Sequence, residues 1–186
     1  MSSLLTVDAL VAGYQVPVVG PVSLTLRAGE VVALNGPNGS GKSTVLAALL
    51  GNARSFSGAV TIAREARLAW LSQRSPLDDP LPMTAAEYLA LAGADVALVP
   101  DGLRGLLDRR VDRLSGGQRQ MLRICAAMGQ SANLVLLDEP TNNLDPRNSE
   151  YLVQMLAERT AERAVLLVCH EADLVARVAS REVSLP

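Results

Sequence analysis

This sequence has few aromatic residues, and neither sign of charge is in large excess. Phe, Trp and Tyr make up only 3% of its 186 residues, and the formal net charge is −2. A nucleic-acid-binding surface normally carries a basic patch, and proteins that bind single strands add aromatic side chains on which bases stack. The composition therefore disfavours nucleic acid as a partner.

Long hydrophobic runs and cysteines are also scarce. No apolar run approaches the roughly 18 residues of a membrane-spanning helix, and residues 1–5 carry no basic segment of the kind that begins a signal peptide. The two cysteines, Cys125 and Cys169, lie in apolar surroundings without metal-ligand spacing, which favours buried, reduced thiols. With 49% hydrophobic residues, the chain is expected to bury the core of one compact, soluble, cytosolic domain.

One glycine-rich motif, GPNGSGKST at residues 36–44, stands out against these absences. It fits the phosphate-binding pattern G-x-x-x-x-G-K-[ST], and it lies between an apolar run typical of a strand and a helical run. Backbone N–H groups of such a loop point at an anion, and the following helix adds a positive field. Lys42 would bind the β- and γ-phosphates, and the Ser43 hydroxyl would bind Mg²⁺. The residues expected to bind nucleotide here are Asn38, Gly39, Ser40, Gly41, Lys42, Ser43 and Thr44.

Strand and helix patterns alternate along the chain. Strands are predicted at 4–12, 22–26, 31–35, 59–62, 67–71, 134–137, 164–169 and 181–185, and helices at 43–50, 84–91, 101–107, 115–128, 147–159 and 171–178. This alternation predicts an α/β fold with a largely parallel sheet and a small antiparallel part. Residues 75–82 hold three of the ten prolines, so we expect them to cross from a core lobe (about 1–75 and 115–186) to a helical lobe (about 76–114).

Two carboxylates, Asp138 and Glu139, follow a buried apolar run. Beside a phosphate loop, Asp138 could hold Mg²⁺ opposite Ser43, and Glu139 could polarise an attacking water as general base. A charged pair that only caps a strand is the alternative. His170 follows the next buried run and could donate a hydrogen bond to a γ-phosphate oxygen, although a lone histidine at a strand end is usually structural or solvated.

Two further side chains are ambiguous from the sequence. Tyr14 follows the first predicted strand and could stack on a nucleotide base, or it could be an ordinary loop or edge-strand residue. Gln73 follows the strand predicted at 67–71, and its amide could reach the metal or the attacking water.

The motifs and their order resemble the ATP-binding cassette (ABC) ATPases, the nucleotide-binding subunits of ABC transporters. The resemblance covers nearly the whole chain, and an LSGGQ sequence beside a phosphate loop is a highly specific pair. The motifs that carry it are the phosphate loop at 36–44, Gln73 as the Q-loop, LSGGQ at 114–118 as the signature, Walker B at 134–139, the D-loop at 143–145 and His170 as the switch histidine. The resemblance implies a P-loop NTPase fold with a compact helical subdomain, in a single domain at 1–186.

The resemblance also implies an ATPase that works as a head-to-tail pair, most simply a homodimer. ATP with Mg²⁺ would lie between one subunit's phosphate loop and the other's signature, and Tyr14 would stack on the adenine. The signature and D-loop residues expected at the nucleotide are Ser115, Gly116, Gly117, Gln118 and Asp145. Closure and hydrolysis would move the helical lobe against a transmembrane permease subunit, so the chain would lie on the inner face of the cell membrane. An uptake system would add a substrate-binding protein.

Departures from the family pattern indicate which kind of ABC ATPase to expect. The chain is short, and RRVDR at 109–113 stands where exporters carry a TxVGExG motif. These features favour a stand-alone subunit with separate permease chains, and PLPMT at 80–84 resembles metal-ion uptake cassettes. Two alternatives remain open. One is a non-transport ABC ATPase acting on ribosomes or DNA, because NNLD at 142–145 resembles the D-loop of the translation-factor members. The other is a nucleotide-binding scaffold that does not hydrolyse ATP, which the presence of Glu139 and His170 disfavours.

Overall fold

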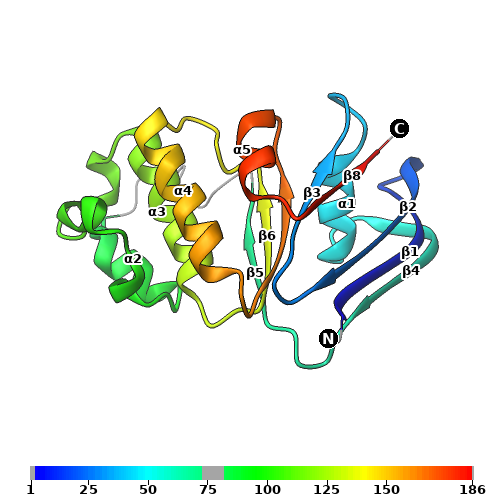
Figure 1. Cartoon of the computed structure of the whole chain (residues 1–186), viewed down its shortest axis with the longest axis horizontal. Helices are drawn as coiled ribbons and strands as arrows, with labels where there is room; N and C mark the ends of the chain where they lie inside the picture. The colour runs from blue at the N-terminus through cyan, green and yellow to red at the C-terminus, as the bar shows by residue number, and fades with distance from the viewer. Residues whose placement is uncertain (1–2, 73–81, 186) are drawn as a thin grey trace.

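A five-stranded parallel sheet lies at the centre of the protein (Figure 1). The computed structural model describes residues 3–72 and 82–185. The strand order is β5-β6-β7-β3-β8, and every neighbouring pair is parallel. The strands are β3 (Val31–Asn35), β5 (Leu68–Leu71), β6 (Leu134–Asp138), β7 (Ala164–Val168) and β8 (Arg181–Ser184). The predicted α/β fold with a parallel sheet is therefore confirmed.

A three-stranded antiparallel sheet packs beside the parallel one, with strand order β2-β1-β4. Its strands are β1 (Ser3–Gly13), β2 (Pro17–Arg27) and β4 (Arg54–Ile62). The predicted strands 22–26 and 59–62 are thus too short at their N-terminal ends. Most of β4 is exposed, so its sequence lacks the alternation of apolar and polar residues by which a half-buried strand is recognised.

Alternate residues of the buried strands contribute to two separate hydrophobic cores. Val135 and Leu137 of β6 belong to one core, and Leu134 and Leu136 belong to the other. All four side chains are 0% exposed, as expected for a parallel strand that is covered on both faces. The first core includes apolar residues of α3, α4 and α5, and the second includes residues of α1 and of the antiparallel sheet.

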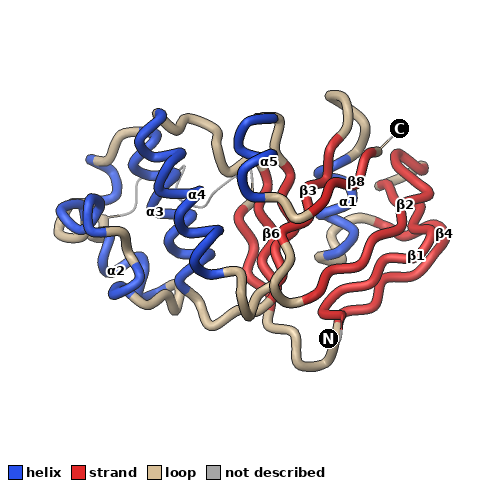
Figure 2. The backbone as a smooth tube through the Cα atoms, in the orientation of Figure 1, coloured by secondary structure: helices blue, strands red, loops and turns tan. Residues whose placement is uncertain are grey.

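The helices gather mainly on the side of the parallel sheet away from the antiparallel sheet (Figure 2). In the described part of the chain they are α1 (Lys42–Leu49), α2 (Ala85–Leu91), α3 (Gly116–Gly129), α4 (Pro146–Arg159) and α5 (Ala172–Val178). Short 3₁₀ segments at Val96–Leu98, Asp101–Leu106 and Val111–Arg113 connect α2 to α3. The helix predicted at 101–107 is thus a 3₁₀ segment, and Gly102 and Gly105 weaken its helix propensity.

The starts of the main helices follow local capping chemistry. Thr84 opens α2 and Ser115 opens α3, each with a capping box in which side chain and backbone bond reciprocally. Asp145 caps α4, where Pro146 occupies the first turn. These predicted caps are confirmed, and both cysteines are free and buried as expected.

Candidate functional site

The phosphate loop connects the end of β3 to the start of α1. Gly41 caps the helix with φ of 92°, and a Cβ at this position would lie 2.6 Å from the Cβ of Val19. Only glycine satisfies both the backbone conformation and the close approach of β2. Because the cap has no side chain, the first N–H groups of α1 face the loop without a side-chain partner from Gly41. This is the arrangement that binds an anion at a helix N-terminus.

Lys42 is folded back onto its own loop. Its side chain is only 6% exposed, and Nζ donates hydrogen bonds to the carbonyl oxygens of Gly36 at 2.8 Å and Pro37 at 2.9 Å. A buried ammonium group needs such partners, because the loss of hydration is costly. Phosphate oxygens are stronger acceptors for a cation than neutral carbonyls, so the same group can bind a nucleotide phosphate.

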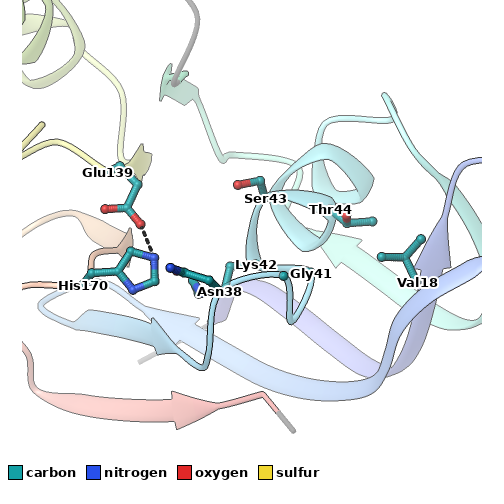
Figure 3. Close-up of a pocket in the computed structure, with 9 residues that line it drawn as sticks. Val18, Asn38, Gly41, Lys42, Ser43, Thr44, Glu139 and His170 are labelled. Atoms are coloured by element: carbon teal, nitrogen blue, oxygen red, sulfur yellow. Dashed lines mark ion pairs between the residues drawn. The ribbon is translucent and has the colours of Figure 1, made fainter.

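One cavity of about 290 Å³ brings eight of the predicted site residues together (Figure 3). Its predicted members come from the phosphate loop, the end of β6 and the end of β7. The lining residues are Val18, Asn38, Gly39, Gly41, Lys42, Ser43, Thr44, Glu139 and His170. Val18 of β2 was not predicted. Recognising that β2 begins at Pro17 would have placed this half-exposed apolar side chain near the loop.

Asp138 ends β6 and is in contact with the start of α1. The Ser43 hydroxyl donates to Asp138 Oδ1 at 3.4 Å. Burial and, to a smaller extent, the charge of neighbouring Glu139 raise the pKa of Asp138 to about 6, although the bond from Ser43 and the charge of Lys42 oppose the rise. A deprotonated Asp138 is a buried charge beside a second carboxylate, so a bound cation would stabilise it.

The oxygen donors here fit Mg²⁺. Hydroxyl and carboxylate oxygens are the protein ligands that this ion accepts, and it usually completes its shell with waters and substrate phosphates. Within residues 3–72 and 82–185, no cluster of three or more His, Cys, Asp or Glu side chains could hold a metal by itself. Ser40 Oγ is buried and has no hydrogen-bond partner within this described part, so the loop also retains an unused polar group.

Glu139 and His170 face the phosphate loop as an ion pair (Figure 3), with Glu139 Oε1 2.9 Å from His170 Nε2. Glu139 has a left-handed backbone with φ of 49°, and its N–H donates to Val168 O of β7 at 2.8 Å. For a residue other than glycine this conformation is uncommon and often marks a functional position. Burial raises the pKa of Glu139, while the charges of His170 and Lys42 oppose the rise. Such a carboxylate is a stronger base than an exposed one.

The signature residues lie away from this cavity, at the start of α3. Ser115 Oγ accepts from Gln118 N at 3.2 Å, and Gln118 Oε1 accepts from Ser115 N at 3.0 Å. Ser115 and Gly116 are exposed. A Cβ on Gly117 would lie 2.7 Å from the carbonyl oxygen of Asn143, so the absence of a side chain allows close contact with the D-loop. Asp145, the last residue of the D-loop, caps α4. Within one chain, these residues do not meet the phosphate loop.

The structure does not place two further predicted residues, Tyr14 and Gln73, at the cavity. Tyr14 lies between β1 and β2, is 60% exposed and is not among the lining residues. Its stacking role stays a prediction. Gln73 lies outside the described residues, and its role also stays a prediction.

Known proteins share both the sequence and the fold. The ABC transporter family model matches residues 19–142. The zinc import ATP-binding protein ZnuC of Roseobacter denitrificans is 37% identical over 192 residues, which cover 98% of this chain and 75% of that protein. The ZnuC protein of Paracoccus denitrificans is 38% identical over 181 residues, covering 93% and 71% of the two chains.

Solved structures give the same result. An ATP-binding subunit of an ABC transporter superposes with a TM-score of 0.82 at 28% identity, covering 98% of this chain and 85% of that one. A metal-chelate type ABC transporter in an inward-facing conformation gives a TM-score of 0.83 at 26% identity, covering 100% and 80%. The predicted resemblance is thus confirmed: this chain belongs to the ABC transporter family, as an ATP-binding subunit that hydrolyses ATP.

Proposed function

We propose that this chain powers the uptake of a metal ion, with zinc as the leading candidate, through a separate membrane permease. The observation that carries the catalytic part is the Glu139–His170 pair, which faces Lys42 and Ser43 across one cavity. The transport part is supported by the relatives named zinc import ATP-binding proteins, which match more than nine-tenths of the chain.

The phosphate loop can bind nucleotide through a change in the hydrogen-bond partners of Lys42. Lys42 exchanges its two carbonyl partners for β- and γ-phosphate oxygens, while the N-terminus of α1 faces the same phosphates. Ser43 and Asp138 would hold Mg²⁺, which neutralises charge on the β- and γ-phosphates when bound. Val18 offers the only apolar side chain among the cavity-lining residues of the described chain, and so a contact for the uncharged part of the nucleotide.

Hydrolysis needs one proton acceptor and one water. Glu139 takes a proton from the water while the water oxygen bonds to the γ-phosphorus and the bond to the ADP oxygen breaks. His170 keeps the carboxylate oriented through their contact and donates a hydrogen bond to the γ-phosphate. The raised pKa of Glu139 suits it to accept this proton.

A second subunit completes the site. Ser115 and Gly116 are exposed and lie apart from the cavity, so they can reach a γ-phosphate only on a partner chain. We propose a head-to-tail homodimer in which each signature closes over the other subunit's phosphate loop. Division of each subunit into a core lobe and a helical lobe is part of this proposal, because closure changes the position of the helical lobe.

The partner that defines transport is the permease. None of the described helices has the length and apolar character that crossing a bilayer requires. ATP-binding subunits of transporters are peripheral to the membrane, and we propose that this one lies on the cytoplasmic face, with a substrate-binding protein on the opposite side. No nucleic-acid partner is part of this proposal.

Replacing Glu139 by Gln tests the catalytic assignment. Glutamine keeps the shape of the side chain but cannot accept the proton, so we expect ATP turnover to fall at least 100-fold, while ATP binding is retained. Steady-state phosphate release and equilibrium binding of a fluorescent ATP analogue measure the two quantities. Turnover within tenfold of wild type would exclude Glu139 as the base.

The transport assignment is tested in membranes. We expect this chain, used as bait in detergent-solubilised membranes, to retain a polytopic membrane protein, and cells lacking the chain to take up less radioactive zinc at submicromolar concentration. Retention of ribosomal or DNA-bound proteins without a permease would instead support the non-transport alternative.

A further inference from the structure

Two polar side chains of α3 connect the end of β5 to the end of β6. The Arg123 guanidinium donates through Nη2 to the carbonyl oxygen of Ser72, which follows β5. Its Nη1 donates to Gln120 Oε1 at 2.9 Å. Gln120 Nε2 then donates to the carbonyl oxygen of Pro140, which follows β6 by two residues, at 2.9 Å. We call these four residues the Arg123–Gln120 relay.

The direction of every bond in the relay is fixed by chemistry. A backbone carbonyl can only accept and a guanidinium can only donate, so the Gln120 amide has one orientation that satisfies both neighbours. Each donor–acceptor pair polarises the next, and burial strengthens the effect. Gln120 is 6% exposed, so its amide cannot readily be replaced by bulk water as the partner of Pro140.

One end of the relay lies at the protein surface, and the other lies beside the proposed general base. Ser72 and Arg123 line a surface hollow of about 100 Å³ between β5, α2 and α3, together with Trp70 and Tyr88. Pro140 instead follows Glu139, whose backbone is held at φ of 49° and whose carbonyl accepts from Asn142 N at 3.2 Å. The relay therefore connects this surface hollow, between β5, α2 and α3, to the turn that carries the proposed general base.

We propose that Gln120 and Arg123 are positioning residues, which keep the Glu139 turn in its hydrolytic position only while the Ser72 segment is in place. A shift of the Ser72 carbonyl must either break one bond of the relay or displace Pro140. Hydrolysis thereby depends on the position of the Ser72 carbonyl at the surface hollow between β5, α2 and α3. The inference rests on the proposed role of Glu139 as the base.

A double-mutant cycle tests the coupling, because spatial continuity alone does not establish it. The variants are Gln120→Met, Arg123→Met and the double replacement. Methionine keeps the approximate length of each side chain and removes its polar contacts. We expect each single variant to lower kcat about tenfold and the double variant to lower it no further, with KM for ATP within twofold of wild type. Additive losses, or a proportional rise in KM, would overturn the proposal.

The matched control is Arg163→Met. Arg163 donates to the carbonyl oxygens of Met128 and Gln130 at the opposite end of α3, so it also joins a guanidinium to backbone carbonyls of this region but lies outside the relay. We expect this variant to lower the melting temperature with kcat unchanged. An equal loss of kcat in the control would show that the relay variants act through general destabilisation, and would overturn the proposal.

Gln120→Glu separates the two halves of the relay. Glutamate still accepts from Arg123 but, as a carboxylate, cannot donate to the Pro140 carbonyl. We expect kcat to fall as far as in Gln120→Met. Wild-type kcat in Gln120→Glu would show that the link to Pro140 has no effect, and the proposal would fail.

Hydrogen exchange gives a readout that does not depend on hydrolysis. The amides of Asn142 and Leu144 donate to Glu139 O and Thr141 O in the turn after β6. We expect both to exchange several-fold faster in Gln120→Met and Arg123→Met than in wild type or Arg163→Met. Unchanged exchange would overturn the relay, even if the test with Glu139→Gln had failed. Failure of the base assignment and failure of the relay are therefore separate results.

Discussion

Asp138 has a protonation equilibrium that differs between the folded and unfolded chain. Burial raises its pKa from 3.8 to about 6. The folded protein therefore binds the proton more tightly than the unfolded chain, and this contribution to stability decreases as the pH rises from about 4 to about 6. Above that window, the free protein carries a buried carboxylate beside Glu139, and a bound cation relieves the resulting repulsion.

Replacing Asp138 by Asn removes this charge without changing the shape of the side chain. We expect the free energy of unfolding of the nucleotide-free protein to rise by about 3 kcal/mol at pH 8 and by only about 1 kcal/mol at pH 4.5. Urea unfolding at both pH values measures the difference. The same variant should lose the extra stabilisation that Mg²⁺ adds to ATP. An equal change at both pH values would contradict the titration of Asp138.

At the scale of the helix, the same capping chemistry serves two purposes. Thr84 and Ser115 form equivalent capping boxes at the starts of α2 and α3. The cap of α3 is exposed and is proposed to meet the partner's nucleotide, whereas Thr84 pairs through its backbone with Arg110. Two helices of one chain therefore provide a matched comparison of a structural cap and a functional cap.

We expect Thr84→Ala and Ser115→Ala each to lower the free energy of unfolding by about 1 kcal/mol, since each removes one capping hydrogen bond. Only Ser115→Ala should also lower ATP turnover at saturating ATP. Chemical unfolding and steady-state ATPase rates measure the two effects. Equal turnover in the two variants would exclude a role for the Ser115 side chain at the partner's nucleotide.

Much of the fold and of the site is predictable because its chemistry is local. Residues 31–49 contain a strand, the phosphate loop and a helix in direct succession, and the Asp145–Pro146 cap needs no distant partner. Gly102 shows the opposite case. Sequence alone suggests that it weakens a helix, whereas the structure shows that a Cβ there would overlap the hydroxyl of Tyr151 in α4.

Neither Val18 nor the Arg123–Gln120 relay was predicted, and the reason is the same for both. Arg123 and Ser72 are 51 residues apart in sequence, and Gln120 and Pro140 are 20 apart. Neither polar residue of α3 belongs to a pattern with a mechanism of its own. Such contacts follow from how the elements pack, which periodicity and motifs do not specify.

At the scale of the whole molecule, the phosphate loop and the signature belong to different parts of the subunit. The cavity is lined from β2, the loop, β6 and β7, and the signature begins α3. Each subunit of a head-to-tail pair thus contributes half of two sites. Activity per subunit should therefore rise with protein concentration, and two different inactive subunits should restore one intact site between them.

Mixing Lys42→Ala with Ser115→Arg tests this arrangement. Each variant alone should be inactive, because one lacks the loop lysine and the other blocks the signature. The mixed dimer has one intact site, so random pairing of equal amounts should restore about a quarter of wild-type activity. ATPase rates of the separate and mixed proteins measure it. If mixing restores nothing, loop and signature act within the same chain.

The contacts of Lys42 with its own loop bear on how the enzyme resets after each turnover. If the departing nucleotide left a buried ammonium group without acceptors, the desolvated charge would oppose product release. The carbonyls of Gly36 and Pro37 instead provide an internal replacement for the phosphate oxygens. When nucleotide leaves, Lys42 Nζ exchanges phosphate oxygens for backbone carbonyl oxygens. The nucleotide-free site therefore already supplies the hydrogen-bond acceptors that the ammonium group needs.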